Sequence, residues 1–251
     1  MSASSIRVAV AGSTGRLGAL ICDVIEESDD FELAARLTSR SQPEDGADAD
    51  ILVDVTTPDA SPAIVERAIR RGQRVLVGTS GWSADRLAGL QQTVDSVGGA
   101  AVIVVPNFSL GSVLGTALAQ LAAPYFSSIE VIETHHPAKV DSPSGTAVRT
   151  AELIAAAREA AGAAPVVSPF TEQPARGELI AGIPVHSLRL NGTVALQEVR
   201  FGGPGEMLSI HHDTYSNEAY VAGIRAGLDA LRTATGLTVG LDRVLGVGKL
   251  A

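Results

Sequence analysis

The sequence is poor in cysteine, in aromatic residues and in long apolar runs. Cys22 is its one cysteine, so an internal disulfide is excluded, which suits a reducing compartment. Cys22 lies in an apolar helical pattern, which favours a buried structural thiol over a nucleophile. Aromatic residues make up 4% of the 251 residues, so the core must consist mostly of Ala, Val, Ile and Leu. No run approaches the ~20 apolar residues of a membrane-spanning helix.

Clusters of basic residues are also scarce. The formal net charge is -9, whereas a nucleic-acid surface needs grouped Lys and Arg side chains for phosphate. The one local run, Arg67, Arg70 and Arg71, is interpreted as a solvated helix face. No apolar signal region precedes the first expected strand. We therefore expect a soluble cytoplasmic protein that binds neither nucleic acid nor a membrane, although a small anionic ligand can still be held by a local cationic pocket.

The first part of the chain alternates short β-prone runs with helical patterns. A strand followed by a helix, repeated several times, is typical of a parallel sheet with helices on both faces. This pattern predicts an α/β, Rossmann-like domain. The expected strands are residues 6–11, 31–38, 51–55, 74–77 and 100–105, and the expected helices are residues 17–25, 61–71 and 84–94, the last with Ser83 as its N-cap.

The pattern changes after residue 106. Three strands follow one another with glycine turns between them, of which Asn191-Gly192 is the clearest hairpin signal. This arrangement favours an antiparallel or mixed sheet, and hence a second, α+β domain. The expected helices are residues 111–122, 146–161 and 218–233, the expected strands are 129–135, 185–190, 193–201 and 206–211, residues 162–177 are expected to form a loop, and the chain from 236 onward is read as a tail.

A glycine-rich turn separates the first strand from the first helix. Gly12, Gly15 and Gly18 are spaced by two residues each, a variant of the usual dinucleotide-binding spacing. Glycines here let backbone N–H groups approach a pyrophosphate at the helix N-terminus. The spacing alone also fits an ordinary glycine turn. Its position, directly after a strand and at the start of a helix, favours nucleotide binding.

The end of the second expected strand bears on the choice of dinucleotide. An acidic residue there would bind the free ribose 2′-OH of NAD(H), but the stretch 34–42 contains none. Thr38, Ser39 and Arg40 offer hydroxyls and a guanidinium, which suit a 2′-phosphate. A solvated loop position for Arg40 is the alternative. We therefore expect NADPH to be preferred, with NADH as a possible second cofactor.

The segment 133–147 gathers cations in an acidic chain. His135 and His136 point to opposite faces of the expected strand, so they need not share a role. Ser144 can cap the following helix, and the first backbone N–H groups of that helix, at Gly145 and Thr146, can hold a carboxylate or phosphate. Lys139, in the connecting loop, can reach the same place. A capped helix with a surface lysine would explain each feature singly, but together they indicate a site.

Two other chemistries fit the sequence less well. Adjacent histidines diverge on a strand and therefore do not converge on one metal ion, and no His-Glu-x-x-His or clustered Cys is present. We therefore predict no metal. A Ser-His-Asp hydrolase lacks its Gly-x-Ser-x-Gly turn.

Four motifs resemble those of the 4-hydroxy-tetrahydrodipicolinate reductase family, also called dihydrodipicolinate reductase, of the diaminopimelate-lysine pathway. The resemblance covers nearly the whole chain, and its most specific part is the run from His135 to Ala147. It implies a homotetramer built through the sheet of the second domain, and a C-terminal helix that returns to the nucleotide domain. The motifs are residues 12–18, 78–82, 105–109 and 135–147.

The resemblance also implies roles for individual residues and a division of the chain. His135 would be the general acid/base, Lys139 the proton donor and His136 a substrate contact, with Gly145 and Thr146 at a carboxylate of a small dicarboxylate substrate. Which of His135 and Lys139 delivers the proton stays open. The dinucleotide domain would span residues 1–106 and 216–251, and the substrate-binding and oligomerisation domain residues 107–215. Pyrophosphate contacts would come from Gly12, Ser13, Thr14, Gly15, Arg16 and Leu17, and contacts beside the nicotinamide and its ribose from Gly78, Thr79, Ser80, Val105, Pro106, Asn107 and Phe108.

The implied reaction is the NAD(P)H-dependent reduction of the cyclic hydroxy-imine to tetrahydrodipicolinate with loss of water. Three residues depart from the family pattern: Thr38 replaces an acidic residue, Ser80 replaces a threonine, and Asn217 lies where some members carry an arginine. The alternative functions are an NADPH-binding redox sensor without catalysis and a semialdehyde-type dehydrogenase. The semialdehyde type needs a nucleophilic cysteine in its catalytic domain, whereas Cys22 lies in the first helix.

Overall fold

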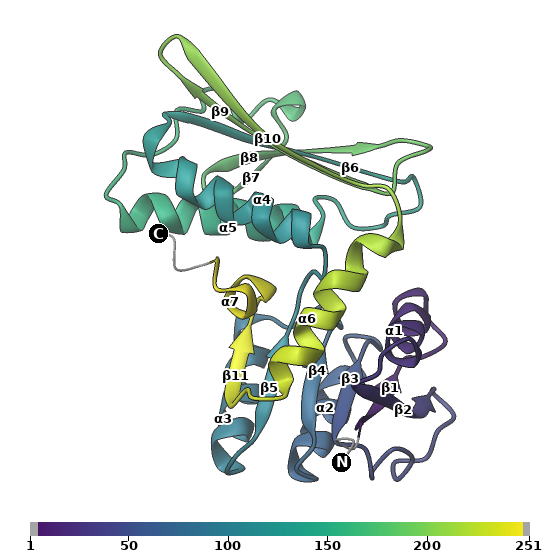
Figure 1. Ribbon diagram of the computed structural model, residues 1–251. Helices are drawn as coiled ribbons and strands as arrows, with labels where there is room; N and C mark the ends of the chain where they lie inside the picture. The colour runs from purple at the N-terminus through teal and green to yellow at the C-terminus, as the bar shows by residue number, and fades with distance from the viewer. Residues whose placement is uncertain (1–4, 248–251) are drawn as a thin grey trace. The chain divides into compact units, whose positions relative to one another are not determined.

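A computed structural model describes residues 5–247 of the chain, which fold as two compact units (Figure 1). Unit 1 contains the described residues up to Ser109 together with Tyr220–Leu245, and unit 2 contains Leu110–Ala219 with Gly246 and Val247. The chain therefore leaves unit 1 and returns to it. No helix within residues 5–247 is long and apolar enough to cross a membrane.

Unit 1 is built on a parallel sheet with the strand order β11-β5-β4-β3-β1-β2. Every neighbouring pair in it is parallel. Central strands such as β3 and β5 are buried along their whole length, which explains their continuous apolar runs. The strands are β1 (Ile6–Ala11), β2 (Phe31–Leu37), β3 (Ile51–Asp54), β4 (Arg74–Val77), β5 (Ala101–Val104) and β11 (Gly236–Val239).

Helices cover both faces of this sheet. On one face α2 and α3 pack against alternate strand residues, including Leu52, Val75 and Val102. On the other face α1 packs against α6, and α6 lies over β4 and β5 (Figure 1). The bounds are α1 (Arg16–Glu26), α2 (Ser61–Arg70), α3 (Ala84–Ser96), α6 (Val221–Leu231) and α7 (Leu241–Leu245).

Local signals explain where these helices begin and how closely they pack. Ser83 caps α3, as predicted, by accepting a hydrogen bond from the backbone N–H of Arg86 at 3.4 Å. Pro62 lies in the first turn of α2, where a missing N–H costs nothing. Gly223 of α6 is in contact with the carbonyl of Phe108, so a side chain at this position would overlap the backbone.

The predicted tail from residue 236 is wrong. Gly236–Val239 forms β11, which extends the sheet by pairing in parallel with β5, and α7 follows it. Four residues are too few to show a strand pattern, and only the exposed edge of β5 makes pairing favourable. The predicted helix 218–233 is shorter than expected: a 3-10 turn, Asn217–Tyr220, precedes α6, which ends at Leu231.

Unit 2 is built on a mixed sheet with the strand order β10-β9-β6-β8-β7. The β6–β8 pair is parallel, and the other pairs are antiparallel. The short edge strand β7 was not predicted, because its three residues lie between the expected loop 162–177 and the expected strand 185–190 and are too few to show a strand pattern. The bounds are β6 (Ser128–His135), β7 (Glu178–Ile180), β8 (Ile183–Arg189), β9 (Ala195–Gly203) and β10 (Glu206–Thr214).

Two helices, α4 (Leu110–Ala122) and α5 (Gly145–Ala160), pack on one face of this sheet (Figure 1). The core between them contains Val131 of β6, Phe201 of β9 and Ile154 of α5, all buried. Small residues such as Ala151 let the helix approach the strands closely. The predicted α/β class, with a Rossmann-like parallel sheet and a second mixed sheet, is confirmed.

A buried guanidinium lies beside this core, in the last turn of α5. Arg158, near the end of α5, is 6% exposed. It donates hydrogen bonds to the backbone carbonyls of Ala123, Phe126 and Ala164. These carbonyls follow the ends of α4 and α5, where no helical partner is available for them. Burial lowers the pKa of Arg158 below its ordinary value.

We predict that Arg158→Met destabilises unit 2 by about 2–4 kcal/mol, because the replacement leaves these carbonyls buried without donors. Urea unfolding followed by far-UV circular dichroism measures this change. Arg149→Met is the matched control, since Arg149 lies on the same helix and is exposed. Equal free energies of unfolding for the two variants would contradict the prediction.

Candidate active site

The carboxyl ends of four neighbouring strands line up along one edge of the sheet in unit 1. The order β5-β4-β3-β1 places the loops that follow these strands side by side. Parallel α/β sheets bind ligands at this edge. The loops contain Gly12 after β1, Thr56 after β3, Gly78 after β4 and Val105 after β5.

The glycine-rich turn after β1 has the geometry of a cradle. Gly12 has a φ of 87°, and a side chain there would overlap the backbone carbonyl of Val55. Gly18 of α1 lies against the carbonyl of Gly12, so it too must lack a side chain. Gly15 is the N-cap of α1 and provides no side-chain cap. The first N–H groups of α1 therefore remain available to an anion.

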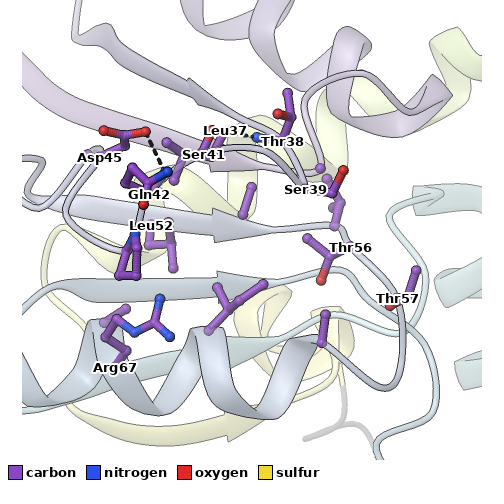
Figure 2. Close-up of a pocket in the computed structure, with 18 of the residues that line it drawn as sticks. Leu37, Thr38, Ser39, Ser41, Gln42, Asp45, Leu52, Thr56, Thr57 and Arg67 are labelled. Carbon is purple, nitrogen blue, oxygen red and sulfur yellow. Dashed lines mark hydrogen bonds between the residues drawn. The ribbon is translucent and has the colours of Figure 1, made fainter.

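A cavity of about 530 Å³ lies beside this turn, between the loop that follows β2 and helix α2 (Figure 2). The predicted residues Gly12, Thr14, Gly15, Thr38 and Ser39 line it, whereas Arg40 is absent from its lining. The exposed Arg40 instead donates its backbone N–H to Thr38 Oγ1 at 3.2 Å. The other lining residues include Thr56, Thr57, Asp45, Arg67 and Arg71.

Arg67, Arg70 and Arg71 are all exposed on α2 or at its end, as predicted for a solvated helix face, but two of them also line the cavity. Arg67 and Arg71 line the cavity, and Arg71 Nη1 donates to the carbonyl of Pro43 at 2.7 Å. The loop after β2 folds over this side of α2, which helical periodicity cannot foresee. Figure 2 shows Arg67 on α2 toward the same end of the cavity as Gln42 and Asp45 of the facing loop, away from Ser39.

A buried carboxylate organises the loops at this edge. Asp54, the last residue of β3, is 0% exposed. It accepts hydrogen bonds from Ser61 of α2, from Thr79 Oγ1 at 2.8 Å and from Thr56 Oγ1 at 2.6 Å. Trp82 Nε1 donates in turn to Ser61 Oγ at 3.1 Å. Asp54 thus ties the turn after β4 to the turn after β3 and to the start of α2.

The remaining predicted cofactor residues occupy the same edge. Thr79 is buried, Ser80 is exposed, and the ring of Phe108 packs against Gly78. Ser13 Oγ donates to the carbonyl of Leu37 at 3.0 Å, which links the glycine turn to the end of β2. Arg16 and Leu17 begin α1, and Val105, Pro106 and Asn107 directly follow β5.

In unit 2 the predicted catalytic histidine belongs to a buried polar cluster. His135 ends β6, and its Nδ1 lies 2.5 Å from Oε2 of Glu133. Glu133 is 0% exposed and also accepts from Arg189 Nη1 at 3.0 Å and from the backbone N–H of Ser144 at 3.2 Å. The cluster therefore joins β6, β8 and the start of α5.

The ionisation of this cluster follows from its contacts. Burial acts to raise the pKa of Glu133, but hydrogen bonds from Ser187, His135 and Arg189 outweigh it, so the pKa lies below its ordinary value. Burial lowers the pKa of His135, and the positive charges of Lys139 and Arg189 add to the effect. Glu133 opposes this shift without cancelling it. His135 is therefore neutral at pH 7 beside an ionised Glu133.

Lys139 lies in the loop between β6 and α5 and contacts a carboxylate. Its Nζ donates to Oδ1 and Oδ2 of Asp141 at 2.7 and 2.9 Å. The same carboxylate accepts a hydrogen bond from the backbone N–H of Gly145, the first residue of α5. The pKa of Asp141 is lowered by these contacts, although burial acts in the opposite direction. An ammonium and a helix N-terminus therefore converge on one carboxylate.

The start of α5 matches the sequence prediction. Ser144 is its N-cap and accepts a hydrogen bond from the backbone N–H of Ala147 at 3.2 Å. Gly145 and Thr146 form its first turn. His136 directly follows β6 and is half-buried, and its carbonyl accepts the N–H of Lys139 at 3.1 Å in a tight turn. Among residues 5–247, no group of three His, Cys, Asp or Glu side chains is arranged to hold a metal ion.

The sequence analysis did not identify several residues that lie around His135 in unit 2 and beside the cavity in unit 1. Glu133 lies two residues before His135 on a strand, so the period of two places both on one face and could have revealed it. Thr56 and Thr57 follow β3 and could have been found from the carboxyl-end rule. Arg189 comes from β8, and no sequence signal links it to Glu133 before the β6–β8 pairing is known.

Comparison with known proteins identifies relatives over the full described length. A family model described as "Dihydrodipicolinate reductase, N-terminus" matches residues 6–108, and one described as "Dihydrodipicolinate reductase, C-terminus" matches residues 111–245. The 4-hydroxy-tetrahydrodipicolinate reductase of Clavibacter sepedonicus is 53% identical over 95% of this chain and 85% of its own length. That of Streptomyces coelicolor is 44% identical over 96% of this chain and 98% of its own.

Solved structures agree with the sequence comparison. A dipicolinate-bound dihydrodipicolinate reductase from Paenisporosarcina sp. TG-14 has a TM-score of 0.80 and 29% identity, and the match covers 95% of this chain and 99% of that one. An apo scyllo-inositol dehydrogenase from Lactobacillus casei has a TM-score of 0.63 at 12% identity, which shows a shared fold alone.

These relatives are named reductases and match both units, so they give no support to a sensor without catalysis. The resemblance read from the four sequence motifs is confirmed by both family models and by the curated relatives. The chain belongs to the dihydrodipicolinate reductase family and is an oxidoreductase.

Proposed function

We propose that this enzyme reduces 4-hydroxy-tetrahydrodipicolinate to tetrahydrodipicolinate with NAD(P)H and loss of water, in lysine and diaminopimelate biosynthesis. The observation that carries the proposal is the convergence of the Lys139 ammonium and the Gly145 N–H on one carboxylate, in the same loop-helix segment as His135. The substrate of this reaction is a ring that carries two carboxylates. The Paenisporosarcina relative was solved with dipicolinate, a ring dicarboxylate, bound to it.

The dinucleotide binds in unit 1 and supplies the hydride when bound. The fit rests on the cradle at Gly12, where a side chain would overlap the Val55 carbonyl, and on the uncapped start of α1. The cavity beside this cradle suits the adenosine end of the cofactor. The pyrophosphate is held by residues 12–17, and the turns at 78–80 and 105–108 hold the nicotinamide end.

The substrate binds in unit 2. One carboxylate of the substrate accepts hydrogen bonds from the backbone N–H groups of Gly145 and Thr146 at the start of α5, where the helix dipole favours an anion. His136 contacts the same ligand. Asp141 is the internal carboxylate that currently receives the hydrogen bonds of Lys139 and Gly145. Substrate binding therefore replaces one carboxylate by another at these donors.

Lys139 delivers the proton. One ring carbon receives the hydride, and its neighbour must receive a proton for the charges to balance. His135 is neutral, and its Nδ1–H faces Glu133, so its remaining nitrogen is an acceptor. Lys139 carries three N–H donors on a flexible stem. His135 serves as the base that takes the ring proton lost in the dehydration, and it returns this proton to the hydroxyl group, which leaves as water.

The enzyme assembles as a homotetramer in the cytoplasm. The face of the mixed sheet opposite α4 and α5 carries exposed apolar side chains, such as Leu188 at 40% and Met207 at 67%. Exposed apolar side chains on a sheet face favour association with another copy. Sedimentation velocity tests the tetramer, and a monomer at micromolar concentration would exclude it.

We predict that His135→Ala and Lys139→Ala each lower kcat by about 10²–10⁴-fold, the usual contribution of a positioned acid or base. The affinity for NADPH should stay unchanged, because neither residue lies in unit 1. Steady-state oxidation of NADPH with enzymatically generated substrate measures kcat, and NADPH fluorescence measures cofactor binding.

His211→Ala is the control, since His211 is exposed and contacts Asp213 on β10. Wild-type kcat in both His135→Ala and Lys139→Ala would refute the assigned chemistry. No turnover by the wild-type enzyme, despite tight NADPH binding, would refute the proposed reaction.

NADPH is preferred over NADH on this proposal. The end of β2 offers the hydroxyls of Thr38 and Ser39 to the cavity and no carboxylate. The cavity carboxylate, Asp45, is engaged by the backbone N–H of Gln42 at 2.8 Å. Arg40 is exposed beside this end and can reach a 2′-phosphate from solvent.

We predict that Thr38→Asp lowers the ratio of kcat/KM for NADPH to that for NADH by at least about tenfold, because a carboxylate repels a 2′-phosphate and binds a 2′-OH. The Asp oxygen can still accept the Arg40 N–H that Thr38 accepts. Arg40→Gln should lower the ratio less. Arg70→Gln is the control, as Arg70 pairs with Glu66 outside the cavity. Equal ratios in Thr38→Asp and wild type would contradict the preference.

A further inference from the structure

Glu133 is a buried carboxylate with more partners than a catalytic acid or base would use. It lies on β6, two residues before His135, on the face of the sheet that α5 covers. Both its oxygens are engaged: Oε2 by His135 Nδ1 at 2.5 Å and by Arg189, and Oε1 by Arg189 Nη2 at 3.1 Å and by Ser144 N at 3.2 Å. With 0% exposure, it has no direct access to a ligand in solvent.

The sheet pairing explains how these groups meet. In the parallel register of β6 with β8, Arg189 is the partner of His135, and Ser187 is the partner of Glu133. The Arg189 guanidinium donates hydrogen bonds to both oxygens of the Glu133 carboxylate. It also donates to the carbonyl of Asp141 at 2.6 Å. Arg189 therefore compensates the buried charge and holds the loop that carries Lys139.

The contact with Glu133 determines which nitrogen of His135 carries a proton. A carboxylate accepts hydrogen bonds and donates none, so Nδ1 must carry the hydrogen in this contact. The neutral imidazole then has its lone pair on Nε2. The nitrogen that is fixed by a partner decides the chemistry of the other one.

We propose that Glu133 is a positioning residue that fixes the tautomer and ring orientation of His135, and that Arg189 holds the Glu133 carboxylate in place. This inference rests on the proposed function, because it assigns Nε2 of His135 as the acceptor in that reaction. Through Ser144, the same carboxylate sets the distance between His135 and the start of α5. Glu133 thus keeps the base in register with the helix N-terminus that holds the substrate carboxylate.

The protein contains a comparable trio that serves as a control. Glu130, on the same strand, contacts His186 Nε2 at 2.8 Å and pairs with Arg176. Glu130 and Glu133 are three residues apart, so they lie on opposite faces of the sheet. The Glu130 trio has the same residue types without contact to His135. The Glu130 side chain is 35% exposed against 0% for Glu133, so Glu130→Gln reports the loss of a less buried carboxylate of the same type that does not contact His135.

The test combines a spectroscopic readout with kinetics. Nitrogen chemical shifts of ¹⁵N-histidine-labelled protein, assigned with His135→Gln, report the tautomer at high pH, where the imidazole is neutral. We expect the Nδ1–H form for His135 in the wild type. In Glu133→Gln, the amide oxygen should pair with Arg189 and the amide NH₂ should face His135, which inverts the tautomer to Nε2–H.

The kinetic arm measures kcat and KM with NADPH and enzymatically generated substrate. Glu133→Gln should lower kcat roughly a hundredfold, in the range of a misdirected acid or base. The KM for NADPH should not change. Glu133→Asp keeps the carboxylate and should recover part of the kcat, whereas Glu130→Gln should keep kcat at the wild-type value.

The outcomes separate this inference from the proposed function. An Nε2–H tautomer in the wild type, or wild-type kcat in Glu133→Gln, overturns the inference while the proposed reaction stands. No turnover by the wild type overturns the proposed reaction, and the tautomer measurement still tests the contact of Glu133 with His135. Because that measurement uses the unmutated protein, it does not depend on the folding of any variant.

Discussion

The buried carboxylate of Glu133 is the group on which the geometry of the polar cluster in unit 2 depends. It joins β6, β8 and the start of α5, which are adjacent to one another only in the folded sheet. A buried carboxylate is tolerated only with full hydrogen bonding and a compensating charge, and Arg189 supplies both. One buried group thereby links His135, the start of α5 and, through Arg189, the loop that carries Lys139.

Unit 1 also contains a buried carboxylate that joins several segments, but its hydrogen-bond partners are different. Asp54 is also 0% exposed and is the last residue of a central strand, but its side-chain partners are hydroxyls rather than cations. These hydroxyls donate hydrogen bonds to the Asp54 carboxylate without adding positive charge to the turns that follow β3 and β4. In each unit, a buried acid at the carboxyl end of a strand holds neighbouring loops in register.

The sequence was informative where local periodicity and caps decide structure. Strand β1 and the capped helices α3 and α5 begin within a residue of their predicted positions, because Ser83 and Ser144 are strong local signals. It failed where a distant segment decides. β11 is a strand only because β5 offers an edge, and Arg67 lines a cavity only because the loop after β2 folds over α2. The Glu133–Arg189 contact likewise exists only through the β6–β8 register.

Two ion pairs near the start of α5 place cations beside carboxylates in this acidic chain. The formal net charge is -9, and two cations of unit 2 are paired with carboxylates of the same unit, Lys139 with Asp141 and Arg189 with Glu133. These two pairs differ in burial: Glu133 is 0% exposed, whereas the Asp141 side chain is 57% exposed. A solvent-screened pair is weak and exchangeable, while a buried one is costly to break. On the proposed function, the substrate carboxylate therefore displaces Asp141 from Lys139 while the Glu133 cluster stays intact.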